Sequence, residues 1–305
     1  GVPYDDVARR LALSTGGLYH SLESSPLVGR PDEVSSMLLF RLKSLYQNMD
    51  EALELARSII RESRVDDTAR LREIFSELRN DMRSAVVPAG HSFAALRAGS
   101  HLKASVALDD RWRGIGQLEF LAGLAEGDGA ALDEVAGKLR ALRDRIVTRE
   151  RMLLNITAEE EHFDEVREAV LEKTAALSEG RERGGLGSAA DTKETGATPL
   201  ATATTILAPK PHDGTETGDP PLRWESLIVP AAVGYAATVV PAATYGEDAH
   251  PIQVLLAQLL KTDYLWERVR MQGGAYGAFA STGALEGIFT LLSYRDPDPG
   301  HSFEV

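Results

Sequence analysis

The sequence predicts an α+β fold, in which a mixed or antiparallel sheet is flanked by pairs of helices, in two units joined by a flexible linker. Three observations lead to this prediction. Helical and strand-like patterns are mixed along residues 1–178, without the regular β–α–β alternation of a parallel sheet. Residues 179–221 are rich in glycine, threonine, alanine and proline. Strand-like and helical patterns return from residue 222 onward.

The chain is expected to begin with a helix and two strands. Apolar residues at helical spacing favour a helix over Pro3–Leu13, and Thr15-Gly16-Gly17 is a typical stop signal. Gly17–Leu27 and Val34–Leu45 then have the composition and alternation of strands, around a turn at Gly29-Arg30-Pro31-Asp32.

A helical region follows the two strands. Apolar stripes predict helices over Asp50–Ile60 and Asp66–Val87. Further expected elements are helices at His91–Leu102, Gly114–Gly123 and Ala130–Arg145, a strand at Met152–Ile156, and a helix that runs from a capping box at Thr157 and Glu160 to about Leu177.

Residues 179–221 bury too little apolar surface to offset the entropy of ordering, so we interpret them as an interdomain linker, with an active-site lid as the alternative. The elements expected beyond them are strands at Trp224–Val229 and Tyr235–Val240, a helix at Asp248–Leu260 continuing into Tyr264–Met271, and strands at Ala275–Ser281 and Gly287–Tyr294. The first two of these strands are apolar on both faces and are therefore expected in the middle of a sheet. We predict a helix-rich domain over 1–178 and the first part of a second, incomplete domain over 222–305.

Composition and charge exclude several classes of function. Hydrophobic residues make up 43% and charged residues 26% of the chain, as is usual for a soluble globular protein. The net charge of −13 argues against a nucleic-acid partner and against adhesion to anionic membranes, because both need a cationic surface. The chain has no cysteine, which excludes thiolate metal sites, and no apolar run of about 18 residues that would predict a membrane-spanning helix.

The best candidate site lies where a helical pattern gives way to a strand. Arg270 and Tyr276 stand on either side of the Gly273-Gly274 pair. Glycine lacks a Cβ, so the backbone can turn sharply there and a ligand can approach closely. An arginine and a tyrosine at such a junction are suited to binding carbonyl or oxyanion oxygens. The alternative interpretation is an ordinary helix C-cap that leads into a buried strand, with Arg270 solvated.

A longer pattern surrounds this junction. Its C-terminal elements are Tyr264-Leu265, Val269-Arg270, Gly273-Gly274-Ala275-Tyr276-Gly277, Gly287-Ile288-Phe289 and Ser293-Tyr294-Arg295-Asp296-Pro297. Its upstream elements are Pro3-Tyr4-Asp5, Thr15-Gly16-Gly17, Gly90-His91-Ser92 and Arg97-Ala98-Gly99. In order and approximate spacing they resemble the C-terminal half of the presequence protease branch of the pitrilysin/insulinase zinc metallopeptidases, truncated at both ends.

The resemblance implies a specific function. Enzymes of this type close two homologous halves around a peptide, and the N-terminal half carries zinc. The matching C-terminal half would supply Tyr276 to stabilise the oxyanion and Arg270, with Gly273 and Gly274, to bind substrate. The chain is therefore expected to be the substrate-clamping part of a zinc metalloendopeptidase that degrades oligopeptides. Its partners would be oligopeptides and its own N-terminal half. The alternative is a non-catalytic structural or assembly subunit related to these peptidases.

No metal site is expected in the chain itself. The inverted H-x-x-E-H motif of the family, which would supply two zinc ligands, does not occur in the sequence. His162 follows Glu159-Glu160-Glu161, which we interpret as a solvated acidic helix start. We therefore expect this chain alone to bind no catalytic zinc and to be inactive. The expected compartment is the bacterial cytoplasm, with the matrix of a mitochondrion or plastid as the alternative.

Overall fold

The structure, a computed structural model, describes residues 4–178, 224–229 and 231–305, so the linker predicted over 179–221 lies outside the described residues. The chain divides into two compact units. The first comprises Gly1–Ser21, Leu38–Glu73 and Gly127–Ala201, and the second comprises Leu22–Met37, Ile74–Glu126 and Thr202–Val305. The boundary expected between 178 and 222 stays a prediction about which parts fold independently. Among the described residues no helix has the length and apolar character needed to cross a membrane.

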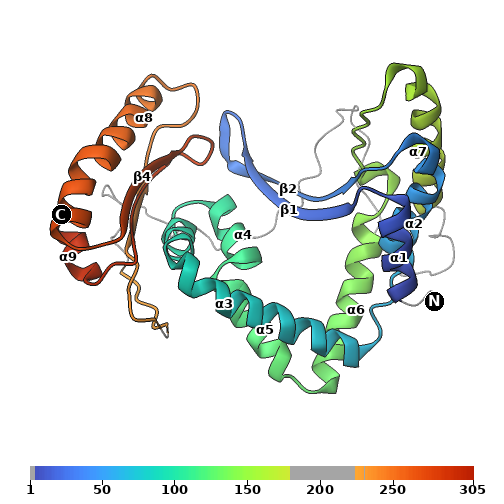
Figure 1. Cartoon of the computed structure of the whole chain (residues 1–305), viewed down its shortest axis with the longest axis horizontal. Coiled ribbons are helices and arrows are strands. Elements are labelled where there is room, and N and C mark those ends of the chain that lie inside the picture. The colour runs from blue at the N-terminus through green and yellow to red at the C-terminus, as the bar shows by residue number, and fades with distance from the viewer. Residues whose placement is uncertain (1–3, 179–223, 230) are drawn as a thin grey trace, which may run out of the picture. The chain divides into compact units, whose positions relative to one another are not determined.

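The first unit is built from helices (Figure 1). They are α1 (Tyr4–Ser14), α2 (Met49–Glu62), α6 (Gly129–Ile146) and α7 (Phe163–Ser178), with short 3₁₀ turns η1 (Tyr46–Asn48), η2 (Arg149–Arg151) and η3 (Glu160–His162). Helix α2 packs against both α1 and α7. The fully buried side chains of this unit are Ala52, Leu55, Leu132 and Ala136. Each is an apolar side chain on the inner face of an amphipathic helix, which is the pattern that drives helices together.

A long hairpin and the helix α3 contribute residues to both units. The hairpin consists of β1 (Leu18–Leu27) and β2 (Arg30–Leu42). Its turn is shorter than expected, because Gly29, with φ of 75°, completes it and Arg30 already belongs to the second strand.

Helix α3 (Thr68–Ser100) joins two helices that the sequence predicts separately, Asp66–Val87 and His91–Leu102. Pro88 lies inside it, and Ala89 has non-helical angles of −118° and 19°. Proline removes one backbone donor and crowds the preceding turn, so the helix bends here without ending. Two further helices follow in the second unit, α4 (Ala104–Arg113), which the sequence did not predict, and α5 (Ile115–Glu126).

The C-terminal part of the second unit is an antiparallel sheet in the order β3–β5–β4. Its strands are β3 (Ala237–Pro241), β4 (Gly277–Gly283) and β5 (Ile288–Tyr294), and a short helix α9 (Pro299–Glu304) follows them. Helix α8 (Ala249–Leu259) packs on one face, where Ala257, Ala280 and Phe289 form a buried cluster (Figure 1). The antiparallel α+β character predicted from the sequence is confirmed.

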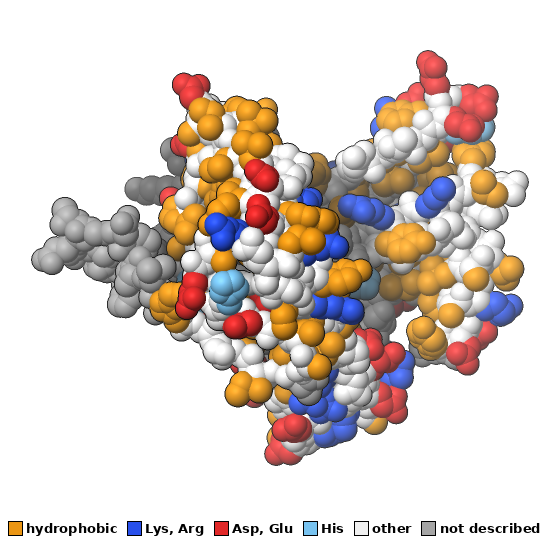
Figure 2. Space-filling model, turned by 60° about the vertical axis from the view of Figure 1, so that its left-hand side comes forward, with side chains coloured by type: hydrophobic (Ala, Val, Ile, Leu, Met, Phe, Trp, Pro, Cys, Tyr) orange, Lys and Arg blue, Asp and Glu red, His pale blue; other side chains and the backbone are white. Residues whose placement is uncertain are grey.

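The outer side of α8 remains apolar. Figure 2 turns this part of the molecule forward and shows hydrophobic side chains over α8, among acidic and basic ones. The exposed apolar residues on α8 are Ile252, Val254, Leu255, Leu256 and Leu259. The opposite face of the sheet receives the C-terminal part of α3, and its contacts with the strands are described with the site below.

Four predicted elements are wrong in position or kind. Met152–Ile156 and Trp224–Val229 are not strands, because neither segment pairs with another strand in the described structure. β3 lies at the edge of the sheet and not in the middle, which β5 occupies. Helix α7 begins at Phe163, after η3, and not at the expected capping box.

Candidate functional site

The candidate site lies at the end of the long helix that covers the C-terminal sheet. After α8 the helix continues as two π-helical segments, η5 (Leu260–Tyr264) and η6 (Trp266–Gln272). The wide turns are visible in the hydrogen bonding, since the N–H of Gly273 donates to the carbonyl of Arg268 at 3.0 Å. Wide turns of this kind are uncommon in helices and are frequent at functional sites.

The Gly273-Gly274 pair ends this helix. Gly274 has a φ of 81°, and its N–H donates to the carbonyl of Arg270 at 3.0 Å, as in a left-handed helix C-cap. A Cβ on Gly273 would lie 2.6 Å from the carbonyl oxygen of Val269, so no side chain fits there without a backbone shift. The helix C-cap considered as the alternative interpretation is therefore present. It does not compete with a functional role, because the cap also fixes the backbone of Arg270.

Arg270 is half-buried and is held by aromatic rings. Its Cζ lies 3.8 Å from the ring centre of Trp266 and 6.0 Å from that of Tyr276. Over the part of the chain that the structure describes, its guanidinium takes part in no ion pair or hydrogen bond. Its N–H groups are therefore available to an oxygen ligand, such as a peptide carbonyl.

Tyr276 follows the glycine pair and precedes β4. Its side chain is 67% exposed, and its ring stands edge-on to that of Tyr294 with the centres 5.9 Å apart. The backbone N–H of Tyr276 donates to the carbonyl of Arg295 at 3.2 Å. Arg295 has a φ of 47°, which is unusual for a residue with a side chain. The phenol hydroxyl has no hydrogen-bond partner among the described residues, so it can donate to a ligand.

A second layer of aromatic rings supports the site from the other face of the sheet. His91 on α3 contacts the ring of Tyr294 edge-on, with the centres 4.7 Å apart, and also lies 6.4 Å from Tyr235 and from Phe279. Burial lowers the pKa of His91, which favours the neutral ring. Its Nδ1 is buried without a partner. The expectation that His91 packs and does not act as a base agrees with these contacts.

The approach of α3 to the sheet depends on a glycine and on a tyrosine hydroxyl. A Cβ on Gly90 would collide with the ring of Tyr235, so the helix can reach the strand only through glycine. The hydroxyl of Tyr235 donates to the carbonyl of Val87, which lies one residue before the kink at Pro88. The ends of β5 and α9 are also joined, by the buried carboxylate of Asp296, which accepts from the N–H of Asp298 at 2.9 Å and from the hydroxyl of Ser302 at 2.6 Å.

A charged network lies elsewhere in the same unit. Arg97 donates to both carboxylate oxygens of Glu225, at 2.8 and 2.9 Å, and to Asp110 at 3.1 Å. Its hydrogen bonds to Glu225 lower the pKa of that carboxyl to about 2. Asp110 is only 3% exposed and also accepts from the N–H of Ile115. Every group of this network is matched within the chain, which is typical of a structural role.

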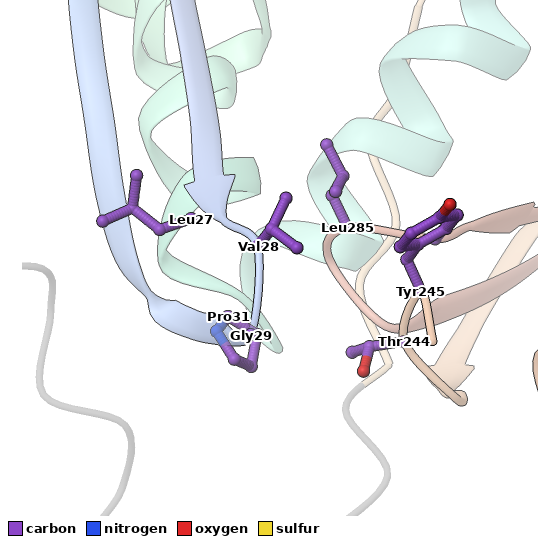
Figure 3. A pocket seen from close by; sticks show the side chains of 8 residues that line it. Leu27, Val28, Gly29, Pro31, Thr244, Tyr245 and Leu285 are labelled. Carbon is purple, nitrogen blue, oxygen red and sulfur yellow. The ribbon is translucent and has the colours of Figure 1, made fainter. Parts of the chain in front are cut away.

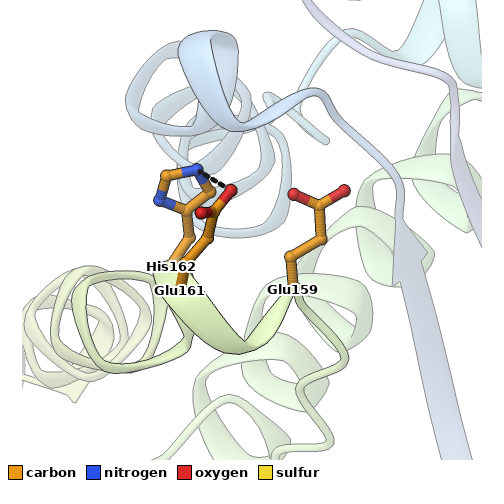
Figure 4. Close-up of side chains that lie close together, drawn as sticks. All are labelled: Glu159, Glu161 and His162. Atoms are coloured by element: carbon orange, nitrogen blue, oxygen red, sulfur yellow. Dashed lines mark ion pairs between the residues drawn. The ribbon is translucent and has the colours of Figure 1, made fainter.

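Among the described residues, one group could hold a metal by the proximity of its side chains: Glu159, Glu161 and His162 at the start of α7 (Figure 4). Both glutamates are exposed, and the ring of His162 stacks on Tyr46 at 3.7 Å. Nε2 of His162 lies 3.4 Å from a carboxylate oxygen of Glu161. These residues do not fit a catalytic zinc, which takes a fixed set of buried and oriented ligands. The expectation of a solvated acidic turn stays in place.

A small pocket in the second unit offers little to a ligand. It lies between the tip of the hairpin and two loops of the sheet, and Figure 3 shows its lining. The residues are Leu27, Val28, Gly29, Pro31, Thr244, Tyr245, Ala284 and Leu285. None of them is charged, and the space of about 10 Å³ holds no more than a single water.

The sequence reasoning found the central pair but not its supports. The structure brings together Arg270, Tyr276 and the glycine pair at one junction, as expected. Trp266 and Tyr294 were not recognised as part of the site. A signal for Trp266 was present, because residues four apart on a helix are neighbours. No local signal reveals His91 as a contact of Tyr294, since the two residues are far apart in the sequence.

Comparison with known protein families gives two matches. Residues 2–124 match the model of the associated domain of family M16 peptidases, subfamily C. Residues 224–304 match the model described as "PreP C-terminal domain". The second match contains the whole junction from Trp266 to Tyr276.

Several curated proteins are similar to this chain. Presequence protease 1 of Arabidopsis thaliana, named as chloroplastic and mitochondrial, is 25% identical over 93% of this chain and 24% of its own length. The mitochondrial presequence protease of Yarrowia lipolytica is 28% identical over 94% of this chain and 26% of its own length. That of Saccharomyces cerevisiae is 28% identical over 99% of this chain and 29% of its own length. The chain thus spans about a quarter of the length of these relatives.

Proposed function

The chain belongs to the presequence protease branch of the pitrilysin family, as its C-terminal part, and on this premise we propose that it is the substrate-clamping portion of a zinc metalloendopeptidase that degrades oligopeptides. Its partners are oligopeptide substrates and the N-terminal half of the complete protein. Peptide hydrolysis is a property of the two halves together.

One observation carries the proposal: two hydrogen-bond donors without partners in the described chain lie side by side at one junction. The Cζ of Arg270 is 6.0 Å from the ring centre of Tyr276, so both side chains can reach the same short stretch of peptide. A structural arginine normally has a carboxylate partner, and a phenol placed for packing alone has no need of 67% exposure.

The two donors have different roles in the proposed reaction. The phenol of Tyr276 donates to the oxygen that becomes negatively charged as the peptide carbonyl is attacked. This interaction is strongest in the transition state and therefore accelerates the chemical step. The guanidinium of Arg270 binds a backbone carbonyl of the peptide and fixes its register. That interaction exists in the bound substrate as well.

Gly273 and Gly274 are proposed to serve substrate binding indirectly. Their N–H groups donate to the carbonyls of Arg268 and Arg270, both at 3.0 Å, and so are engaged in the helix cap. What they leave to the substrate is space, because neither carries a Cβ between Arg270 and Tyr276.

Zinc is proposed as a cofactor of the complete enzyme, bound outside this chain. The acidic turn at Glu159–His162 does not have the character of a catalytic site, and the sequence contains no inverted zinc motif. We therefore propose that this chain alone is inactive. Elemental analysis of the purified chain for zinc, together with a peptidase assay with and without chelator, tests this. Stoichiometric zinc with chelator-sensitive activity would contradict it.

The compartment is a proposal of the same kind. The relatives described above carry "mitochondrial" in their names, and one is also named chloroplastic. These names favour an organelle matrix over the bacterial cytoplasm for a eukaryotic source. Fractionation of the source cells, with detection of the complete protein, decides between the two.

The test of the proposed function is Tyr276→Phe in the complete protein. The substitution keeps the ring on Tyr294 and removes only the hydroxyl. Loss of one oxyanion donor lowers kcat by about 10²–10³. KM and the melting temperature should change little, because the lost bond forms only in the transition state. A kcat within a few-fold of the wild type would remove the catalytic role and favour a non-catalytic, structural subunit.

A further inference from the structure

We propose that Trp266 is a positioning residue for Arg270: its indole ring holds the guanidinium flat and leaves the hydrogen-bonding edge of the guanidinium open to the peptide. The inference rests on the proposed function, in which Arg270 binds a substrate carbonyl. It adds a residue that neither the family pattern described above nor the pair of donors includes.

The contact between the two side chains is close. The Cζ of Arg270 lies 3.8 Å from the centre of the Trp266 ring, which is the distance of direct stacking. Trp266 is 46% exposed, so the ring is not simply a core residue that Arg270 happens to touch. The neighbouring Val269 is the residue of η6 that enters the core, where it is 3% exposed.

The backbone favours this pairing. Trp266 and Arg270 are four residues apart in η6. A helix with i→i+5 hydrogen bonds has more than four residues per turn, so residues four apart lie almost directly above one another along its axis. The cap then fixes the second of the two residues, because the N–H of Gly274 donates to the carbonyl of Arg270.

The other charged residues of η6 are engaged with one another. The amide of Gln272 donates to Glu267 at 3.1 Å and accepts from Arg268 at 3.3 Å. Neither Glu267 nor any other carboxylate of the described chain pairs with Arg270. Arg268 is thus the polar, exposed arginine of the segment and Arg270 is the stacked one, which makes Arg268 a matched control.

The kind of support matters for function. A carboxylate would orient the guanidinium by occupying its N–H groups, which are the groups that must bind the peptide. An aromatic ring contacts the flat face of the guanidinium instead and leaves the N–H groups in its plane unused. Trp266 can therefore order a long, flexible side chain without competing with the substrate.

The experiment is steady-state peptide hydrolysis by the complete protein with four variants and one double variant. They are Trp266→Leu, Trp266→Phe, Arg270→Ala, Arg268→Ala, and Trp266→Leu combined with Arg270→Ala. We expect Trp266→Leu to raise KM about two- to fivefold, the size of an exposed cation–π contact, with a smaller effect on kcat. Trp266→Phe should restore most of the loss, because it keeps a ring. Arg268→Ala should leave KM unchanged.

The double variant separates this inference from the proposed function. If Trp266 acts through Arg270, Trp266→Leu should add nothing to Arg270→Ala. An equal loss in both backgrounds would overturn the inference and leave the role of Arg270 intact. The inference would also be overturned by a normal KM in Trp266→Leu when Arg270→Ala is impaired. Normal kinetics in Arg270→Ala itself would overturn the proposed role of Arg270 first. Melting curves serve as the folding control, and Trp266→Met provides a second variant without a ring if Trp266→Leu is unstable.

Discussion

Arg97 and Arg270 are two arginines of the same unit in opposite environments. Arg97 has three hydrogen bonds to the carboxylates of Asp110 and Glu225. Arg270 rests on Trp266 and has no carboxylate partner in the described chain. In the first case the protein satisfies the guanidinium itself, and in the second it orients the guanidinium and leaves it unsatisfied. The difference teaches that the partners of a charged group say more about its role than its charge does.

The largest effect should come from breaking the satisfied arginine. Arg97→Met removes the partner of Asp110, a carboxylate that is 3% exposed. Removing one member of a buried ion pair costs about 3 kcal/mol, because the other charge stays buried. We expect a loss of this size in the free energy of unfolding, measured by urea denaturation. A change below about 0.5 kcal/mol, as at an ordinary surface site, would show that Asp110 is not held by Arg97.

The unsatisfied arginine should give the opposite result. Arg270→Ala should leave the urea midpoint near that of the wild type, since no partner loses a hydrogen bond. In the complete protein it should raise KM for a peptide by about tenfold, because a hydrogen bond to a charged group is worth roughly 1.5–3 kcal/mol. The comparison fails if Arg270→Ala destabilises the fold as much as Arg97→Met does.

A smaller effect should follow from a change to the cap that fixes Arg270. Gly274→Ala places a Cβ at a φ of 81°, and its contact with Pro297, at 3.4 Å, is tolerable. The left-handed backbone should therefore account for most of the cost, about 1–2 kcal/mol in unfolding free energy. Gly246→Ala, at a φ of 94° in a loop with open space around the new Cβ, is the matched control for the backbone term. An equal loss of peptidase activity in both variants would argue against a role of the cap in positioning Arg270.

The smallest effect is a dependence on pH. The pKa of Glu225 falls from its ordinary value of 4.5 to about 2, chiefly through hydrogen bonds from Arg97, with His101 also near its carboxylate. A lowered carboxyl pKa stabilises the fold above pH 4.5, and the contribution is lost as the pH falls toward 2. The difference in unfolding free energy between wild type and Glu225→Gln should therefore shrink as the pH is lowered through this window. A difference that does not vary with pH would show that the charge of Glu225 is not what Arg97 binds.

The sequence predicted what local patterns can encode. Amphipathic spacing located α1, α2, α5, α6 and α8 to within a few residues. The Gly273-Gly274 pair marked the end of the long helix, because glycine readily adopts the left-handed angles that such a cap needs. The same pair marked the candidate site, since Arg270 and Tyr276 can converge only where the chain turns between them.

The errors concern what depends on distant partners. Met152–Ile156 has the composition of a strand, but Leu153 is 77% exposed and no other strand pairs with it in the described structure. Ile228, in another expected strand, is 98% exposed for the same reason. A strand forms only when a neighbour supplies hydrogen bonds, and an apolar run does not reveal whether one is present. The order β3–β5–β4 and the contact of His91 with Tyr294 are likewise set by the tertiary fold.

The π-helical segments after α8 set the angular phase of the site. Each residue in a regular α-helix advances the side-chain direction by about 100°, from 3.6 residues per turn, and a residue in a wider turn advances it by less. Along Leu260–Gln272 this difference accumulates and rotates Arg270 relative to the apolar side of α8 that packs on the sheet. The number of residues in this segment therefore determines the direction in which the site faces. A one-residue deletion between Leu260 and Tyr264 would turn Trp266 and Arg270 together, preserving their contact while directing both away from Tyr276.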